Sequence, residues 1–477
     1  MTPLNKLLLL ILIIPCLLLI QCSSPNLNSN PQTNEQPNNR RITFRVLAPT
    51  QLWRHWLEAG PVQAAEMVND YDIQVIPEYG NIGDYNKNAR ISIEKSNAPD
   101  IVFANTNSLL EWAAKGDIQP LENCRERYDQ FDNIASELWL PATFDGHVWG
   151  IPVNIEIDML FFNKEKLREV GWSETRIDLL PYQIAEGSYT LTDLGNTVQS
   201  AMNKGVIKPG FGFWIGNYGS TFGILYMAYE QEKVNNDLSV VIVEETAIYN
   251  TFDFYHTVVD SKFFHESFMR PNVTSSWSTR LLQNDAVMSG QVLFWRGRSD
   301  MWAQWMYDFE NGSYSQDPTG FIGMAPFPTG VPGLGGHIRG AVNYYVLPTR
   351  SLTGNRYQDA TCALLAKAIS PEINIPQAYN SHYLSTLDSD ITNTTYLGNP
   401  FLEAGWKFQK NIYLYRQPYE SKYHPSFAYE LTDFMDMVGF EEISAETATE
   451  LSIEKLQNNL DSPNNERKII IVKSVDD

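Results

Sequence analysis

One segment, in which a polar turn leads into a long extended run, constrains the fold of this chain more than any other part of its sequence. Residues Asp145–Pro152 combine glycine, aspartate and proline in the manner of a tight turn. The run Asn154–Lys164 then alternates, because Asn154, Glu156 and Asp158 are separated by isoleucines. Successive side chains of a β-strand point to opposite faces. The sequence therefore predicts a strand with one polar face, at a point where the chain crosses from one lobe to another.

The N-terminus is typical of an exported lipoprotein. An apolar run, Leu7–Ile20, follows Lys6 and is too short to span a bilayer, so we interpret residues 1–21 as a signal peptide. Cys22 stands where a bacterial lipoprotein carries its acylated cysteine, although Gln21 departs from the small residue usual before it. The alternative is a signal peptide processed elsewhere. Residues 22–41 are almost devoid of apolar side chains, which predicts a flexible tether.

Composition limits the partners. The formal net charge of −21 would repel nucleic acid and anionic lipid head groups, so we expect no nucleic-acid partner, whereas a neutral solute is compatible with it. The mature chain, 43% hydrophobic over the full sequence, is long enough for two lobes with separate cores. Cys124 and Cys362 would remain after processing, and the sequence leaves open whether they form a disulfide or stay as thiols.

Strand and helix signals alternate along the chain. A β-rich run at Ile42–Leu47 precedes a helical pattern over residues 50–67 and a second strand at Ile73–Ile76. The apolar run Ala98–Ala104 predicts a buried strand that feeds a helix ended by Gly116. The alternation predicts α/β layers.

Two further helix starts carry capping signals. Asn163 precedes a helical run that Gly171 ends. Thr190 and Asp193 form a capping-box pattern for a helix that ends near Gly205.

The search for catalytic motifs finds one acidic pair. The chain has no nucleophile elbow, no zinc-binding His-Glu-x-x-His and no phosphate-binding loop, and we expect no metal or cofactor. Glu156 and Asp158 would suit a glycosidase, which needs two carboxyls about 5–9 Å apart. Binding of a polyol explains the same pair, since carboxylates accept hydrogen bonds from hydroxyls. A third interpretation is that the pair only solvates the strand.

Aromatic rings are the second ingredient of a sugar site, because their flat faces cover the C–H faces of a pyranose. Trp214 lies among glycines and other small residues, and Trp295 and Trp302 lie in the stretch Gly290–Trp302. Core packing explains each tryptophan equally well.

Arginines offer a different ligand chemistry. Arg296, Arg298 and Arg339 are able to recognise a phosphate or carboxylate on a solute, and they are equally able to act as surface or lobe-bridging side chains. His337 follows Gly335 and Gly336, and we interpret it as a hydrogen-bonding surface imidazole.

The segment Asp145–Lys164 resembles the signature DG-x-x-YG-x-P…YNK of family 1 extracellular solute-binding proteins, the sugar-capturing subunits of ABC importers. Weaker motifs of the same family follow in the expected order. They are the strand and helix at Ala98–Glu122, the strand and Gly-Gly turn at Phe321–Gly336 and the helix ending at Ser370–Glu372. The resemblance covers most of residues 42–460.

The resemblance implies a two-lobed α/β periplasmic-binding-protein fold, class II-like, with a ligand cleft between the lobes. The chain would cross between lobes near residues 150–154, 336–342 and 399–405. The implied N-terminal lobe is 42–152 plus 340–400, and the C-terminal lobe is 153–339 plus 401–461. Residues 462–477 would form a tail.

The implied function is that of a non-enzymatic receptor on the periplasmic or extracellular face, anchored through a lipid on Cys22. It would capture a sugar or polyol as a monomer and deliver it to the permease subunits and ATPase of an ABC importer. Alternatives are a surface-anchored glycosidase, a receptor for glycerol phosphate or acidic sugars, and a scaffold that binds no solute. The implied ligand contacts are Trp53, Asn105, Asn107, Glu156, Asp158, Trp214, Trp295, Arg296, Trp302, Gly336 and His337.

Overall fold

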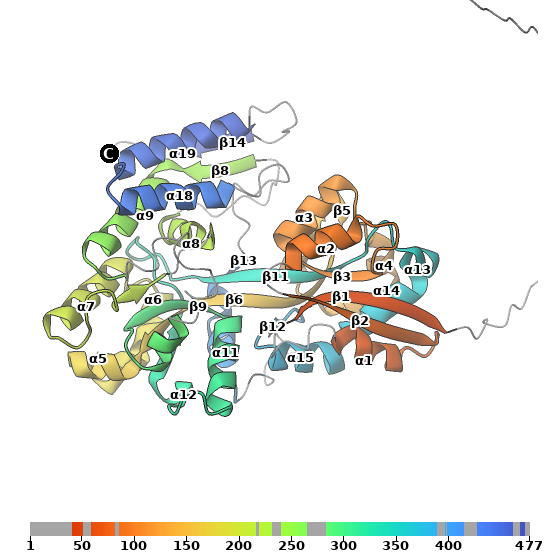
Figure 1. Ribbon diagram of the computed structural model, residues 1–477, viewed down its shortest axis with the longest axis horizontal. Helices are drawn as coiled ribbons and strands as arrows, with labels where there is room; N and C mark the ends of the chain where they lie inside the picture. The colour runs from red at the N-terminus through yellow and green to blue at the C-terminus, as the bar shows by residue number, and fades with distance from the viewer. Residues whose placement is uncertain are drawn as a thin grey trace, which may run out of the picture. The chain divides into compact units, whose positions relative to one another are not determined.

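The computed structural model describes ten stretches of the chain, which belong to one compact unit that starts at Arg41 (Figure 1). They are residues 41–50, 59–81, 85–215, 219–230, 240–264, 283–388, 396, 398–414, 427–460 and 468–472. The predicted signal peptide, the lipidation site Cys22, nearly all of the tether and Trp53 lie outside the described residues.

A ten-stranded mixed sheet organises the unit. Its main path runs in the order β2, β1, β3, β11, β6, β9, β7. These strands are β1 (Ile42–Thr50), β2 (Ile73–Asn81), β3 (Ile101–Asn105), β6 (Ile151–Asn163), β7 (Phe213–Trp214), β9 (Phe294–Arg298) and β11 (Ile338–Val346). Off this path, β10 (Ile322–Ala325) and β12 (Leu384–Ser385) pair with β6, and β13 (Ile412–Leu414) pairs with β11.

Strands β6 and β11 occupy the centre of the sheet and connect its two ends. The first part of β6 pairs antiparallel with β11, and its last part pairs with β9 and β10. The last part of β11 pairs with β3. Both long strands therefore take part in both ends of the sheet, and Figure 1 shows them running between the two groups of helices.

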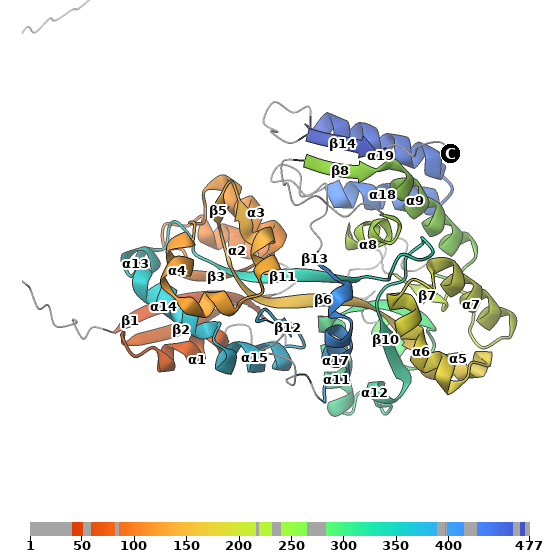
Figure 2. The same ribbon diagram turned by 180° about the vertical axis from the view of Figure 1, so that it is seen from behind.

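Helices pack around the two ends in separate groups. The β1–β3 end carries α1 (Ala59–Met67), α2 (Tyr85–Ile93), α3 (Thr106–Lys115), α4 (Glu122–Arg127), α13 (Leu352–Arg356), α14 (Gln358–Ala368) and α15 (Pro371–Asn380). Around β9 and β10 lie α5 (Lys164–Val170), α6 (Glu174–Ala185), α7 (Leu191–Asn203), α11 (Ser299–Glu310), α12 (Pro318–Phe321) and α17 (Pro400–Lys407) (Figure 2). Short 3₁₀ helices span Asp129–Asn133, Ser136–Ala142 and Gln409–Asn411, and a small hairpin joins β4 (Thr143–Phe144) to β5 (His147–Val148).

A third group of elements includes the predicted tail. It contains α8 (Gly219–Tyr229), α9 (Glu245–Asp260), α18 (Phe427–Gly439) and α19 (Ala445–Leu460). In this group β8 (Val240–Glu244) pairs in parallel with β14 (Lys468–Val472). Part of the segment interpreted as a tail is therefore a strand of this small sheet.

The helix ends follow the capping signals of the sequence. The Asn163 side chain accepts a 3.0 Å hydrogen bond from the Lys166 backbone N–H at the start of α5, and Gly171 ends that helix at φ 102°. Thr190 and Asp193 form the predicted capping box of α7. One boundary differs, because β1 continues to Thr50, where the sequence predicted the start of a helix.

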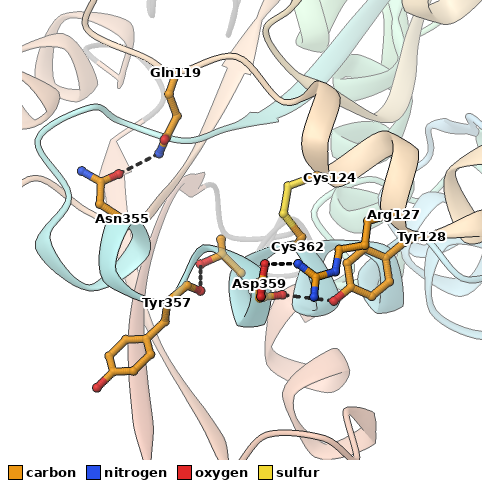
Figure 3. The surroundings of a disulfide bond; sticks show 9 residues. Gln119, Cys124, Arg127, Tyr128, Asn355, Tyr357, Asp359 and Cys362 are labelled. Atoms are coloured by element: carbon orange, nitrogen blue, oxygen red, sulfur yellow. Dashed lines mark hydrogen bonds and ion pairs between the residues drawn. A yellow bond between two sulfur atoms is a disulfide. The ribbon is translucent and has the colours of Figure 1, made fainter. Parts of the chain in front are cut away.

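Cys124 and Cys362 form a disulfide that joins α4 to α14 (Figure 3). Both cysteines are buried, and the bond closes a sequence separation of 238 residues. The question that the sequence left open is thus answered by the fold, which brings two distant helices together at the β1–β3 end.

Candidate functional site

The predicted polar face of β6 is present and continues onto β11. Asn154 lies opposite Asn343, and Asp158 lies opposite Arg339. Directly opposed residues of antiparallel strands share one face of the sheet. The Asn343 side-chain amide donates a 2.8 Å hydrogen bond to the Asn154 side-chain oxygen, which fixes the two strands to each other on this face.

Neighbouring strands extend the polar face in both directions. On one side Arg298 of β9 lies opposite Asp158, with Arg296 two residues earlier on the same face. On the other side Asn105, the last residue of β3, lies opposite Asn343. We call this set the polar row. Its members are Asn105, Asn154, Glu156, Asp158, Arg296, Arg298, Arg339 and Asn343.

The opposite face of the same strands is closed by apolar packing. A Cβ on Gly405 of α17 would lie 2.5 Å from the Ile157 side chain, so the helix backbone approaches β6 closely. Leu384 of β12 lies opposite Ile155, and a Cβ on Gly340 would lie 3.4 Å from that isoleucine. The polar row is thus the face of the central strands whose side chains offer hydrogen-bonding groups, although half of its members are buried within the protein.

Asp158 is held in a buried ion pair with Arg296. The Arg296 Nε lies 2.9 Å from each carboxylate oxygen, and its Nη2 also donates to Asp158. The two side chains are only 5% and 2% exposed. Arg339 Nη1 approaches the same carboxylate at 4.0 Å. The Asp158 carboxylate therefore holds Arg296 through both of its oxygens and lies close enough to Arg339 to attract it.

Glu156 is more accessible. Its side chain is 20% exposed, and its carboxylate lies 3.5 Å from Arg298 Nη1. Arg298 makes a closer contact of 2.9 Å with Asp300, the second residue of α11. The carboxylate of Asp300 raises the pKa of Arg298 above its usual range, although desolvation opposes the shift. Glu156 is therefore the carboxylate of the row with the most loosely held partner.

The tryptophan candidates lie away from the polar row. Trp295 and Trp302 are at most 1% exposed and stack on Phe161, whose ring centroid lies 5.9 and 6.4 Å from theirs. Trp214 is 2% exposed, stands beside Trp295 in register, and donates its indole N–H to the Gly210 carbonyl at 2.6 Å. Phe161 belongs to the apolar face of β6, so these rings have the packing role that the sequence left open.

The other candidates occupy turns and a helix start. The Asn105 side chain caps α3 by accepting a 2.9 Å hydrogen bond from the Ser108 backbone N–H, and Asn107 is exposed in the first turn. Gly336 is buried, and a Cβ there would lie 2.6 Å from the Ile184 side chain. His337 is 8% exposed, so the interpretation as a surface imidazole is wrong.

Burial of His337 has a consequence for stability. Desolvation lowers the pKa of His337 from 6.5 to about 4, although the carboxylate of Asp158 opposes the shift. Below pH 6.5 the His337 imidazole of the unfolded chain binds a proton, whereas in the folded protein it binds one only near pH 4, so acid favours the unfolded state. Between pH 7 and pH 4.5, we expect the free energy of unfolding of the protein to fall by about 2–3 kcal/mol more than that of a His337→Gln variant. Urea unfolding at both pH values measures this, and equal losses would contradict it.

Sequence reasoning missed Asn343 and Asp300 as members of the site. Asn343 carries the same alternation signal on β11 that identified Glu156 on β6, and it was detectable in principle. Asp300 gave no such signal, because it acts from the first turn of α11 through its contact with Arg298.

Comparison with known proteins identifies the class. Residues 60–375 match the family of bacterial extracellular solute-binding proteins. The match covers more than half of the chain, and the protein belongs to this family. A search of curated proteins finds no match.

Solved structures agree on the fold, a mixed α/β architecture with a curled sheet that matches the two-lobed periplasmic-binding-protein fold. The GacH receptor of Streptomyces glaucescens, solved unliganded and with acarbose, is 15% identical, with a TM-score of 0.68 over 88% of this chain and 98% of that one. The sugar-binding protein MalE of Xanthomonas citri is 14% identical, with a TM-score of 0.67 over 87% and 97%. The cyclic α-maltosyl-1,6-maltose binding protein of Arthrobacter globiformis is 15% identical, with a TM-score of 0.66 over 88% and 99%.

Within the stretches that the structure describes, no helix combines the length and apolar character needed to cross a membrane.

Proposed function

We propose that this protein is the receptor of an ABC importer and that it captures a sugar or polyol on the polar row. The observation that carries the proposal is the position of that row. It lies on the two strands, β6 and β11, that take part in both ends of the sheet. A solute bound there contacts groups that belong to both ends, including Asn105 from β3 and Arg298 from β9.

The position of the row also supplies a mechanism for closure. Among the described residues, β6 and β11 connect the two ends of the sheet, with the short β12 in contact with α15 and α17, so bending of these strands changes the relation between the two helix groups. A solute that contacts both groups stabilises the closed state by its differential affinity, as in other hinge-type receptors. Delivery then requires permease subunits and an ATPase, with Cys22 as a lipid anchor on the outer side of the membrane and the receptor acting as a monomer.

The chemistry of the row suits hydroxyl-rich ligands. Glu156 is a partly exposed acceptor, and Arg298, 40% exposed, is a donor beside it. Carboxylates and guanidinium groups bind vicinal hydroxyls through charge-assisted hydrogen bonds. Sugars in the printed descriptions of related folds, acarbose and cyclic α-maltosyl-1,6-maltose among them, support the same ligand class.

The glycosidase alternative is weaker on these contacts. General acid catalysis requires a carboxylic acid that is free to deliver its proton to the leaving oxygen. Both oxygens of Asp158 accept hydrogen bonds from Arg296 within a buried pair, and only Glu156 of the acidic pair is available. Binding without turnover accounts for the arrangement more simply.

Ligand binding should raise the stability of the protein by linkage. At a hundredfold excess over the dissociation constant the gain is about 2.7 kcal/mol. A thermal-shift panel of neutral and acidic mono- and oligosaccharides, polyols and glycerol phosphates is therefore expected to give at least one clear upward shift. A flat response across the panel would favour the scaffold alternative.

Glu156→Gln should weaken solute binding, because it removes one charge-assisted acceptor while leaving the shape of the side chain. The expected loss is about 1.5–3 kcal/mol, or roughly ten- to more than a hundredfold in affinity. Calorimetry with the saccharide identified in the panel measures the effect, and Glu174→Gln on the exposed start of α6 is the matched control. Equal affinity of the Glu156 variant and the control would remove Glu156 from the site.

A further inference from the structure

Buried nitrogen donors of the polar face lack acceptors. Among the residues that the structure describes, Arg339 Nε and Asn154 Nδ2 are buried without a hydrogen-bonding partner, while His337 lies against the Ile224 backbone. His337 precedes β11 by one residue and stands two positions before Arg339, so extended backbone places both side chains on the same face. Buried polar groups are nearly always satisfied in the functional state of a protein. The missing counterparts are therefore mostly acceptors.

Charge is divided unevenly along the same face. Asp158 is shared by Arg296 and Arg339, so this trio carries one positive charge in excess. Arg298 is shared by Glu156 and Asp300, and that second trio carries one negative charge in excess. Arg339 is the arginine with the weakest partner, at 4.0 Å from a carboxylate that Arg296 already engages.

We propose that the solute carries a carboxylate, which binds the guanidinium of Arg339 beside the imidazole of His337. This inference rests on the proposed function and assigns its ligand class, an acidic saccharide that contains a uronic acid. The carboxylate supplies acceptors to Arg339 and neutralises the excess charge of the first trio. The hydroxyls of the same solute donate to Glu156 at the negative end of the row.

Other ligand chemistries match these contacts less well. Neutral hydroxyls can accept from Arg339 but leave the excess positive charge in place. A phosphate that carries nearly two negative charges exceeds the single charge available. A uronate carries one charge on a planar group that fits the guanidinium fork.

The length of the row indicates more than one sugar ring. Asn154 and Asp158 are four residues apart on β6, a separation of about 13 Å in an extended strand. A solute that satisfies Asn154 at one end and Arg339 at the other spans this distance. We therefore infer an oligosaccharide of at least two units.

The test uses calorimetry with the mature protein and two sets of oligosaccharides, linked uronic acids and their neutral methyl esters. The variants are Arg339→Gln, Arg339→Lys, and Arg168→Gln in exposed α5 as the control. We expect a uronate oligosaccharide to bind at least about tenfold more tightly than its ester. Arg339→Gln should abolish that preference, because it should weaken binding of the uronate at least about tenfold more than binding of the ester. Arg339→Lys should retain part of the preference, and the control all of it.

Three outcomes would overturn the inference. Binding of neutral saccharides without binding of any uronate would overturn the inference and leave the proposed function intact. A uronate preference that Arg339→Gln does not change would exclude Arg339 as the carboxylate site. Absence of binding by any neutral or acidic saccharide would overturn both the inference and the proposed function. Because Arg339 is 20% exposed, circular dichroism is expected to show that Arg339→Gln folds normally.

Discussion

Replacing Arg296 by methionine is expected to destabilise the protein by about 3–5 kcal/mol, the largest effect of any single substitution considered in the polar row. The variant leaves the Asp158 carboxylate 2% exposed without the guanidinium that engages both of its oxygens. Arg339 is 4.0 Å away and compensates only in part. Urea unfolding followed by circular dichroism measures the loss.

A double substitution separates the cost of an orphaned charge from the value of the pair. Arg296→Met together with Asp158→Leu removes both charges and fills the space with apolar atoms. Buried ion pairs replaced in this way are often no less stable than the original, so we expect the double variant to recover most of the loss. The exposed pair of Arg168 and Glu174 provides the control, and Arg168→Met should have little effect. A single variant as stable as this control would show that the pair does not hold Asp158.

Loss of the disulfide is expected to cost about 2–5 kcal/mol, chiefly because the bond restricts the unfolded chain over 238 residues. The bond joins α4 to α14, so it ties together two helices of the β1–β3 end that are separated along the chain by strands β4 to β11. Unfolding of the wild-type protein with and without a thiol reductant measures the effect without changing the sequence.

The control for the reductant experiment is the double variant Cys124→Ala with Cys362→Ala. This variant lacks the bond under both conditions, so its stability should not respond to the reductant. Equal stability of the oxidised and reduced wild-type protein would contradict a stabilising role for the bond.

Local signals in the sequence predicted local structure well. The cap at Asn163 and the capping box at Thr190 depend on residues within three positions, and both are present. The polar face of β6 depends only on the alternation of Asn154, Glu156 and Asp158, and it too is present. These features need no knowledge of distant contacts.

Features that depend on distant partners were not predictable. Asp158 pairs with Arg296 across 138 positions, and only the register of β6 with β9 decides that they meet. The same register places Trp295 on the apolar face beside Phe161. The disulfide needs α4 and α14 to be adjacent, which only the completed fold achieves.

The central claim is that the polar row on β6 and β11 is where this receptor holds a saccharide, and a crystal structure of the protein with its tightest-binding saccharide tests it most directly. We predict that the saccharide lies on that face, with a hydroxyl in hydrogen-bonding distance of the Glu156 carboxylate and an acceptor in hydrogen-bonding distance of Arg339. A saccharide bound elsewhere, with no contact to β6 or β11, would contradict the account.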